Sequence, residues 1–368
     1  MHLAYIIGTY PQASETFIAR EVAGMRARGH VVDLYSLYAP KEREVGVTYG
    51  WSSSTARVVR KLGGTAADRT LARRWRRRVA ESGVEVVVAH FGSQPSTIAQ
   101  EVAGALPLLV SLHARDLYVE AERLAEKCAR AAAVVTCTAA NAAYLRHLFP
   151  ECASRIHLLY HGLPSAWLEA PLPARIRPDK ASLRLLAMGR FVEKKGYSVL
   201  LEACAILRQR GQPFELRLVG AGPLQKALTA QSQRLGIAEG VQWPGWLPPA
   251  DVREAYAWAD LFCCPSLLAA DGDRDGLPNV LTEAMSTGLP AIGSRFSALP
   301  EAIIQDGTGI LVPPGDAPAF AEALIRLTDP ARRASLGLAA ASHIRTHFAA
   351  RPGLDLLEML LRQAICSQ

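Results

Sequence analysis

The sequence lacks long hydrophobic runs, paired cysteines and a signal-peptide pattern. No apolar segment approaches the roughly 20 residues that a membrane-spanning helix needs, although 50% of the 368 residues are hydrophobic. The seven cysteines are scattered, without C-x-x-C pairs or metal-ligand spacing, which favours a reducing compartment over a disulfide framework or a zinc site. Residues 1–8 lack a basic n-region and read as a first β-strand. We therefore expect a cytoplasmic protein without a bound metal.

Positive charge is the main compositional bias. With 41 Lys and Arg against 34 Asp and Glu, the formal net charge is +7, which indicates anionic partners. Part of the excess lies in residues 60–78, whose basic residues are Arg60, Lys61, Arg69, Arg73, Arg74, Arg76, Arg77 and Arg78. This segment fits a peripheral helix at the inner face of a membrane or a solvated, Arg-rich helix. Because the basic residues lack interleaved aromatics, we do not expect nucleic-acid binding.

Short apolar runs alternate with helical patterns, such as residues 15–28 and 115–132, along the chain. The predicted strands are Leu3–Ile7, Val31–Leu37, Val84–Ala89, Leu108–Leu112, Val134–Thr138, Arg184–Met188, Glu215–Val219, Gln242–Trp243, Leu261–Pro265, Pro290–Gly293 and Gly309–Leu311. Continuous apolar strands separated by helices indicate parallel sheets covered on both faces. The fold class that follows is α/β, with two doubly wound, Rossmann-like domains facing across a cleft.

A proline-rich stretch at residues 163–180 divides the two strand series and suits a linker. We predict a first domain at residues 1–168 and a second at residues 169–350. Apolar residues at helical spacing in residues 351–368 predict a closing helix that packs back on the first domain.

The segment at residues 185–196 (LLAMGRFVEKKG) places two cations between a strand and the next helix. Gly189 allows a sharp turn out of the sheet, and Arg190 and Lys195 flank the start of the helix. Two cations at a helix N-terminus suit a diphosphate, whose negative charge grows as it departs in a transfer reaction. Ordinary surface cations on a loop are the alternative.

A second segment, residues 275–285 (DGLPNVLTEAM), follows the strand at residues 261–265. Gly276 and Pro278 mark a loop, and Asn279 or a neighbour would cap the helix that follows. Glu283, one turn into that helix, is placed to accept hydrogen bonds from ribose hydroxyls, and Asp275 to reach a transferred sugar. Two carboxylates at this spacing are, on their own, more often a solvated pair.

The two segments, together with VGAGP at 219–223, GWL at 245–247 and CPS at 264–266, resemble family-four retaining glycosyltransferases of GT-B fold. Within that family, the segments resemble the bacterial exopolysaccharide and colanic-acid type. The resemblance implies that the second domain binds a nucleoside diphosphate sugar, with UDP favoured over GDP. It further implies retaining, metal-independent transfer of a hexose, with the nucleotide sugar as co-substrate and no further cofactor.

The donor-binding residues implied by this resemblance are Gly189, Arg190, Lys195, Gly220, Leu247, Asp275, Gly276, Leu277, Pro278, Asn279, Val280, Leu281 and Glu283. The family usually has Glu where this chain has Asp275. Its shorter side chain leaves Asp271 and Asp273 as alternative contacts to the sugar.

The first half of the chain resembles the same family through YPQASETFI at residues 10–18. The implied first domain binds the acceptor, a glycan, lipid-linked or small molecule, through Ser14, Glu15, Thr16, His90 and Asp116. Capping of the first helix is the alternative role for the residues at 14–16. His113 matches the family's active-site histidine, so the implied catalytic residues are His113, Arg190, Lys195 and Asp275. Residues 160–164 match the domain-junction turn, with Gly162 as a hinge.

Two other functions fit parts of the pattern. Gly220-Ala221-Gly222 after a strand would suit a nicotinamide oxidoreductase, but the third glycine of that fingerprint is replaced by Gln225. A catalytically inactive, sugar-nucleotide-binding sensor or partner subunit would carry the same motifs. Measured donor hydrolysis or sugar transfer would distinguish the enzyme from such a sensor or partner subunit.

Overall fold

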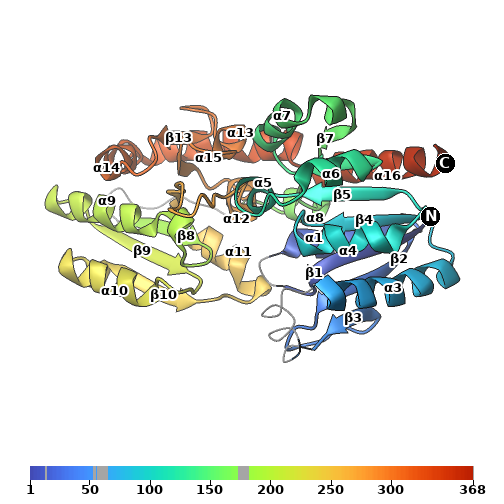
Figure 1. The fold of residues 1–368 in the computed structure, drawn as a ribbon. Coiled ribbons are helices and arrows are strands. Elements are labelled where there is room, and N and C mark those ends of the chain that lie inside the picture. Colours follow the sequence, from blue (N-terminus) through green and yellow to red (C-terminus); the bar gives the residue numbers. More distant parts are fainter. Residues whose placement is uncertain (13–14, 53–54, 56–64, 173–181, 368) are drawn as a thin grey trace. The chain divides into compact units, whose positions relative to one another are not determined.

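The structure, a computed structural model, describes residues 1–12, 15–52, 55, 65–172 and 182–367. The chain forms two compact units: unit 1 comprises Met1–Gly162 with Ala350–Gln368, and unit 2 comprises Leu163–Ala349. Each unit is built on a parallel sheet with flanking helices (Figure 1), which confirms the predicted pair of doubly wound α/β folds. Among the predicted functional positions, Ser14, Arg60 and Lys61 lie outside the described residues.

Unit 1 contains a parallel sheet whose strand order is β3-β2-β1-β4-β5-β6-β7. Its strands are β1 (His2–Thr9), β2 (Val31–Tyr38), β3 (Val47–Trp51), β4 (Val86–His90), β5 (Leu108–Leu112), β6 (Ala133–Thr136) and β7 (Ile156–Leu158). Sequence order reverses between β1 and β4, which makes this the topological switch point of the sheet, where α/β folds of this kind bind ligands. The edge strands β3 and β7 were not predicted, because both are short and only partly buried.

Side chains along each strand of unit 1 alternate between two cores. In β1, Ala4 and Ile6 join the core that includes Trp75 of α3 (Thr65–Ser82), while Tyr5 joins the opposite core with Ile18 of α1 (Thr16–Ala27). Helix α4 (Gln94–Ala103) covers the first face together with α3. Burial of both faces explains why these strands read as continuous apolar runs.

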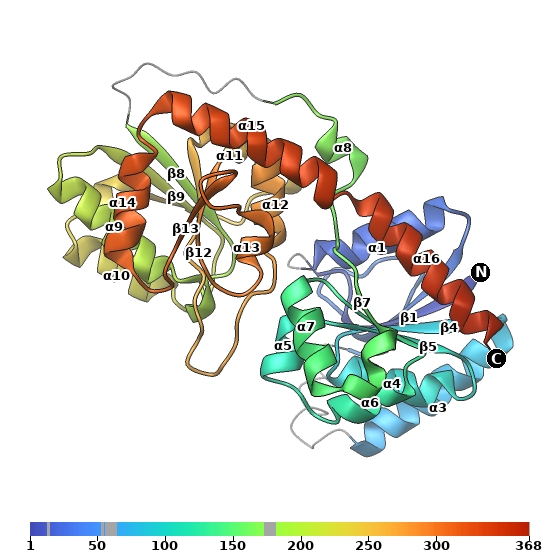
Figure 2. The same ribbon diagram turned by 90° about the horizontal axis from the view of Figure 1, so that it is seen from above.

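The C-terminal helix α16 (Ala350–Cys366) packs on unit 1 beside α1 (Figure 2). Its residues Leu357 and Leu361 enter the same core as Tyr5. At the end of α1, the Arg28 guanidinium pairs with Asp355 at 2.6 Å and with Glu358 at 3.0 Å. The helix is therefore held by both apolar burial and ion pairs.

The remaining helical elements of unit 1 are α5 (Ala114–Tyr118), α6 (Leu124–Arg130), α7 (Ala139–Leu148) and the 3₁₀ helix η1 (Pro150–Arg155). The helical pattern predicted at residues 115–132 is thus interrupted between α5 and α6. Arg123 adopts a left-handed conformation (φ 52°) there. The buried Lys127 ammonium donates to the carbonyl oxygens of Gly92 (2.5 Å) and Glu122 (2.9 Å), which holds the irregular segment against the start of α4.

Unit 2 contains a parallel sheet of order β10-β9-β8-β11-β12-β13. Its strands are β8 (Leu183–Met188), β9 (Phe214–Val219), β10 (Val241–Gly245), β11 (Leu261–Cys264), β12 (Ala291–Ser294) and β13 (Gly309–Val312), and each overlaps a predicted strand. Here the order reverses between β8 and β11. The loops that carry the two predicted donor-binding segments therefore leave neighbouring strands at the switch point.

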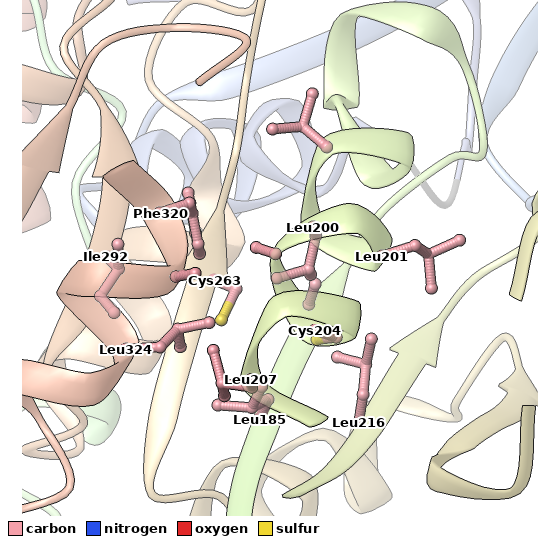
Figure 3. Close-up of a cluster of buried hydrophobic side chains, with 14 of the residues drawn as sticks. Leu185, Leu200, Leu201, Cys204, Leu207, Leu216, Cys263, Ile292, Phe320 and Leu324 are labelled. Carbon is pink, nitrogen blue, oxygen red and sulfur yellow. The ribbon is translucent and has the colours of Figure 1, made fainter. Parts of the chain in front are cut away.

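The helical elements of unit 2 are α8 (Ser165–Leu168), η2 (Glu193–Lys195), α9 (Tyr197–Gln209), α10 (Gln225–Arg234), η3 (Ala238–Gly240), α11 (Pro249–Trp258), α12 (Asn279–Ser286), α13 (Leu299–Ala302), α14 (Ala317–Arg326) and α15 (Pro330–His347). Figure 3 shows Leu200, Cys204 and Leu207 of α9 in one core with Cys263 of β11 and Phe320 of α14. Spacing of four and three residues puts these side chains on one face of α9. The start of α9, beside Lys195, is thereby fixed by its core.

Candidate functional site

Glycines join the loops that follow β8, β9 and β10 in unit 2. The Gly189 N–H donates to the Val219 carbonyl at 2.9 Å, and the Gly220 N–H donates to the Gly245 carbonyl at 2.8 Å. Gly220 has a φ of 130°, and a Cβ added there would lie 2.0 Å from the Gly189 carbonyl oxygen. Only glycine fits this position, so the turn that leads into Arg190 is set by backbone packing.

Two lysines and two aspartates form a compact ion-pair network at the switch point. The Lys195 ammonium lies 2.6 Å from Asp275 Oδ2, and the Lys194 ammonium lies 3.5 Å from Asp275 Oδ1. Lys194 also contacts Asp273 Oδ2 at 3.0 Å. The structure thus brings together Lys195 and Asp275, which the sequence placed in one site from segments 80 positions apart, and adds Lys194 and Asp273.

Burial and charge oppose each other at the Lys195–Asp275 pair. Burial by itself would raise the pKa of Asp275 and lower that of Lys195. The facing charges outweigh it, because Lys195 and Lys194 hold the pKa of Asp275 below its usual value and Asp275 holds that of Lys195 above it. Both groups are therefore ionised near neutral pH. The adjacent Tyr197 hydroxyl is buried and has no hydrogen-bond partner among the described residues.

Arg190 differs from Lys195 in its surroundings. Its side chain is exposed, and within the described part of the chain no carboxylate pairs with it. Its positive charge lies close enough to Lys195 to lower the pKa of that lysine slightly against the stronger effect of Asp275. Arg190 thus supplies a cation that no described carboxylate of unit 2 compensates.

Glu283 lies in α12, which starts after the loop containing Asp275. Its buried carboxylate accepts a hydrogen bond from the Tyr256 hydroxyl at 3.1 Å, and Tyr256 is fully buried in α11. Pro278 occupies the cap position of α12 and Asn279 is the first helical residue, so the expected side-chain cap by Asn279 is not formed. The backbone N–H groups of the first turn of α12 are consequently not capped by a side chain.

The other implied donor-binding residues lie in the same unit as this network. Gly276, Leu277 and Val280 are half-buried around the start of α12, as is Leu247 in the loop after β10. Leu281 is fully buried in the core, so only its backbone could meet a ligand.

In unit 1, His113 lies at the start of α5, directly after β5. The Asp116 carboxylate accepts a hydrogen bond from the His113 backbone N–H at 2.8 Å, and Asp116 is almost completely buried. This contact gives Asp116 a capping function at the start of α5. Burial lowers the pKa of His113, so its imidazole is neutral near pH 7.

Behind His113 lies a buried trio that the sequence did not predict as a unit. The Glu21 carboxylate accepts from the Tyr5 hydroxyl at 2.9 Å and lies 3.1 Å from His90 Nε2. Since a carboxylate can only accept, His90 Nε2 carries a proton. His90 is fully buried, so an acceptor substrate could contact its ring only if the side chains that cover the ring moved. Glu21 had one visible signal, a charged residue on the buried face of α1.

Aromatic rings enclose His113 and His161 in unit 1. The ring of Phe17 stacks on His161, with centroids 3.9 Å apart, and lies 5.1 Å from the ring of His113. Phe91 covers His113 from another side at 4.6 Å. His161 had been interpreted only as part of the junction turn, which Gly162 makes with a φ of 60°. These contacts connect His161 with His113 in one aromatic cluster.

At the start of α1, Glu15 occupies the cap position and Thr16 is the first helical residue. Glu15 is half-buried and makes no capping hydrogen bond through its side chain, whereas Thr16 is exposed. The side chain of Glu15 therefore does not take the capping role. The Glu15 backbone N–H instead donates to the Gln12 carbonyl oxygen at 3.0 Å.

The described part of the basic segment forms α3. Its apolar residues Leu71, Trp75 and Val79 are buried in the core of unit 1, while its arginines are exposed: Arg69, Arg73, Arg74, Arg76, Arg77 and Arg78. The apolar face is thus already covered by the protein, and only a cationic face is open to a partner. No helix of the described residues has the length and hydropathy needed to cross a bilayer.

Two family models match this chain. The model described as Glycosyltransferase Family 4 matches residues 14–166, and the model described as Glycosyl transferases group 1 matches residues 182–329. The chain belongs to the family-four glycosyltransferases of GT-B fold. The second match contains the whole network around Lys195 and Asp275, and the first contains the histidine cluster.

Individual relatives agree with this assignment. The amylovoran biosynthesis glycosyltransferase AmsK of Erwinia amylovora is 39% identical over 183 residues, which is 48% of this chain and 45% of that protein. A GDP-mannose-dependent α-(1-6)-phosphatidylinositol monomannoside mannosyltransferase of Mycobacterium tuberculosis is 27% identical over 291 residues, 72% of each chain. The matches to the first curated relatives span less than half the length of those proteins. Sucrose-phosphate synthase of Thermosynechococcus elongatus has the same fold, with a TM-score of 0.77, 19% identity and full coverage of both chains.

Proposed function

We propose that this protein is a retaining glycosyltransferase that moves a hexose from a nucleoside diphosphate sugar to an acceptor hydroxyl. The observation that carries the proposal is the arrangement of Arg190, Lys195 and Asp275 at the switch point of unit 2. All three residues lie within residues 182–329, the region that the second family model matches. UDP-hexose is the donor that we favour, and GDP-mannose, named for the mycobacterial relative, is the competing donor.

Donor binding is proposed to proceed by exchange of ionic partners. Without a donor, Asp275 neutralises Lys195, whereas Arg190 keeps its charge. A diphosphate that enters beside Arg190 would take over Lys195, and its negative charge would also be favoured at the start of α12. Asp275 would then be free to accept hydrogen bonds from the sugar. Glu283, fixed by Tyr256, would accept them from the ribose.

The transfer step breaks the bond between the anomeric carbon and the diphosphate oxygen and forms a bond from that carbon to the acceptor oxygen. The acceptor proton passes to the departing phosphate oxygen, as proposed for the family. Lys195 and Arg190 would stabilise the negative charge that grows on the diphosphate. We propose that these cations suffice without a bound metal ion. Neutral His113 would accept a hydrogen bond from a sugar or acceptor hydroxyl.

A thermal-shift panel tests the donor site. We expect the wild-type protein to be stabilised by one matched pair, UDP with a UDP-hexose or GDP with GDP-mannose. Saturation at about 100 Kd adds about 2.7 kcal/mol to the free energy of unfolding. Lys195→Met should abolish the shift, whereas Lys226→Met, which removes an exposed lysine of α10, should not. Absence of a shift with every nucleotide sugar would contradict the proposal.

A catalytically inactive, nucleotide-binding protein on the same scaffold is the second candidate. Both candidates predict a thermal shift, but only the enzyme releases nucleoside diphosphate continuously with a suitable acceptor. Product release that is lost in Glu283→Ala and Lys195→Ala, and that persists in excess chelator, would support a metal-independent transferase. The anomeric configuration of the product, read by NMR, tests retention.

The acceptor is proposed to be a glycan or lipid-linked, since AmsK is named for the biosynthesis of a polysaccharide. We further propose that the exposed arginines of α3 place the protein at an anionic membrane surface. Because the apolar face of α3 is buried, this contact would be electrostatic and salt-sensitive. Arg69→Gln with Arg73→Gln and Arg77→Gln should weaken sedimentation with phosphatidylserine vesicles. Equal sedimentation of the triple variant and wild type would contradict the membrane contact.

A further inference from the structure

Lys194 adjoins Lys195 in the sequence but has different surroundings. Its ammonium is buried and contacts both oxygens of Asp273, at 3.0 and 3.1 Å. Asp273 is buried as well, so the pair cannot exchange readily with solvent ions. The proposed transfer reaction gives neither side chain a direct role.

We propose that the Lys194–Asp273 pair is a positioning device for Asp275, which tunes how strongly the site prefers a sugar nucleotide over the bare nucleoside diphosphate. This inference rests on the proposed function, because it concerns the sugar contact of the same donor site. Lys194 and Asp273 act through Asp275 and are positioning residues.

The geometry gives each oxygen of Asp275 its own ammonium group. Oδ2 lies 2.6 Å from Lys195, and Oδ1 lies 3.5 Å from Lys194. When a diphosphate takes over Lys195, Lys194 is the described cation that still holds Asp275. Because Asp273 already binds Lys194 at a shorter distance, that hold is weak, and Asp275 keeps its capacity to accept from sugar hydroxyls.

Backbone contacts join the loop that contains Lys194 to the loop that contains Asp273 and Asp275. The Leu267 N–H donates to the Lys194 carbonyl at 3.0 Å. Within the second loop, the Asp273 N–H donates to Asp271 Oδ1 at 2.9 Å. A Cβ on Gly196 would lie 1.8 Å from the Pro265 carbonyl oxygen, so the loops touch without a side chain between them. A change in the Lys194–Asp273 pair is therefore passed to the loop that carries Asp275.

The same contacts bear on the short side chain of Asp275. Asp273, one of the two alternative sugar contacts, is occupied by Lys194, and Asp271 is exposed and caps the Asp273 backbone. Neither replaces Asp275. The Ser297 hydroxyl donates to the Asp275 carbonyl at 2.6 Å, which fixes the backbone from which the short side chain extends.

The test compares the affinities of two ligands in Asp273→Asn, Lys194→Arg and the control Glu193→Gln. Glu193 neighbours Lys194 and is exposed. The ligands are the nucleoside diphosphate and the sugar nucleotide that stabilise the wild type, UDP with UDP-glucose or GDP with GDP-mannose, measured by isothermal titration. In Asp273→Asn, Lys194 loses its ionic partner Asp273 and pairs more strongly with Asp275. The ammonium group then competes with the sugar hydroxyls for the Asp275 carboxylate. We expect roughly tenfold weaker sugar-nucleotide binding, or ~1.4 kcal/mol, with diphosphate binding unchanged.

Lys194→Arg keeps the charge and should preserve the wild-type ratio of the two affinities, as should Glu193→Gln. An unchanged ratio in Asp273→Asn overturns the inference. So does an equal loss of both ligands together with a lower melting temperature, since that result marks a merely structural pair. In both cases the proposed function stands. A wild-type protein that binds neither ligand overturns the proposed function, and this inference with it.

Discussion

Replacement of Glu21 tests the buried trio behind His113. Its carboxylate accepts from the Tyr5 hydroxyl and from His90 Nε2, and all three side chains are buried. Glu21→Ala leaves a hydroxyl donor and a ring N–H without their acceptor. Glu21→Gln keeps the volume and one acceptor oxygen but removes the charge.

The expected losses follow from these contacts. Glu21→Ala leaves two buried donors, the Tyr5 hydroxyl and the His90 ring N–H, without an acceptor; at about 1.5–2.5 kcal/mol for each donor we expect a loss of about 3–5 kcal/mol. In Glu21→Gln, hydrogen bonds worth about 1.5–3 kcal/mol with a charged acceptor become neutral ones, so we expect a loss of about 2 kcal/mol. Tyr5→Phe removes one hydrogen bond, for about 1 kcal/mol. At about 2–4 °C per kcal/mol, unit 1 should melt about 4–8 °C lower in Glu21→Gln and at least about 6 °C lower in Glu21→Ala.

Differential scanning calorimetry across pH separates charge from packing. Burial would raise the pKa of Glu21, but His90 and Tyr5 together lower it below its ordinary value of 4.5. A carboxylate with a lowered pKa in the folded state contributes stability above its unfolded pKa, and this contribution is lost as the pH falls through the folded pKa. The gap between wild type and Glu21→Gln should thus be full between about pH 5 and pH 8 and narrow at lower pH. A gap that widens on acidification, or no gap at pH 7, would refute the reasoning.

Three further predictions concern other parts of the molecule. Gly220→Ala should unfold or distort the donor-side loops, because its Cβ would lie 2.0 Å from the Gly189 carbonyl oxygen; loss of the nucleotide thermal shift checks this. His113→Ala should lower kcat by roughly 10²-fold. Since burial lowers the pKa of His113, wild-type activity should persist as the pH falls through 6.5 and decline only below it, as a pH–rate profile would show. Arg28→Ala should expose α16 to limited proteolysis; Arg362 and Arg28 hold the pKa of Glu358 at about 2, so the wild-type contact should resist acidification until well below pH 4.5.

The sheets were predictable because each central strand buries both faces. β1, β4 and β11 appear in the sequence as nearly unbroken apolar runs. Such short runs are typical of strands that are buried on both faces of a parallel sheet. The edge strands β3 and β7 escaped prediction because half-buried, short segments lose that pattern. Burial on both faces of the sheet thus decides which strands can be predicted from the sequence and which cannot.

In the candidate site, too, some residues could be predicted from the sequence and others could not. Arg190, Lys195 and Asp275 were found because they stand in segments whose residue order resembles a family. No sequence motif predicts the Lys194–Asp273 pair. Its proposed role depends on the distances between the Lys194 ammonium and the carboxylate oxygens of Asp273 and Asp275. Distances of this kind arise from loop packing, which sequence spacing alone does not encode.

The two units place their charges under different physical constraints. In unit 2, Lys194 and Lys195 face Asp273 and Asp275, so the buried network is neutral before a ligand arrives. An entering diphosphate then replaces Asp275 as the partner of Lys195, and the released Asp275 carboxylate keeps its contact with Lys194, so neither charge loses every partner. In unit 1, by contrast, His113 lies among Phe17, Phe91 and His161, where burial favours neutral rings. A neutral imidazole in apolar surroundings suits an uncharged hydroxyl, so the charge of each site matches the part of the reaction that we assign to it.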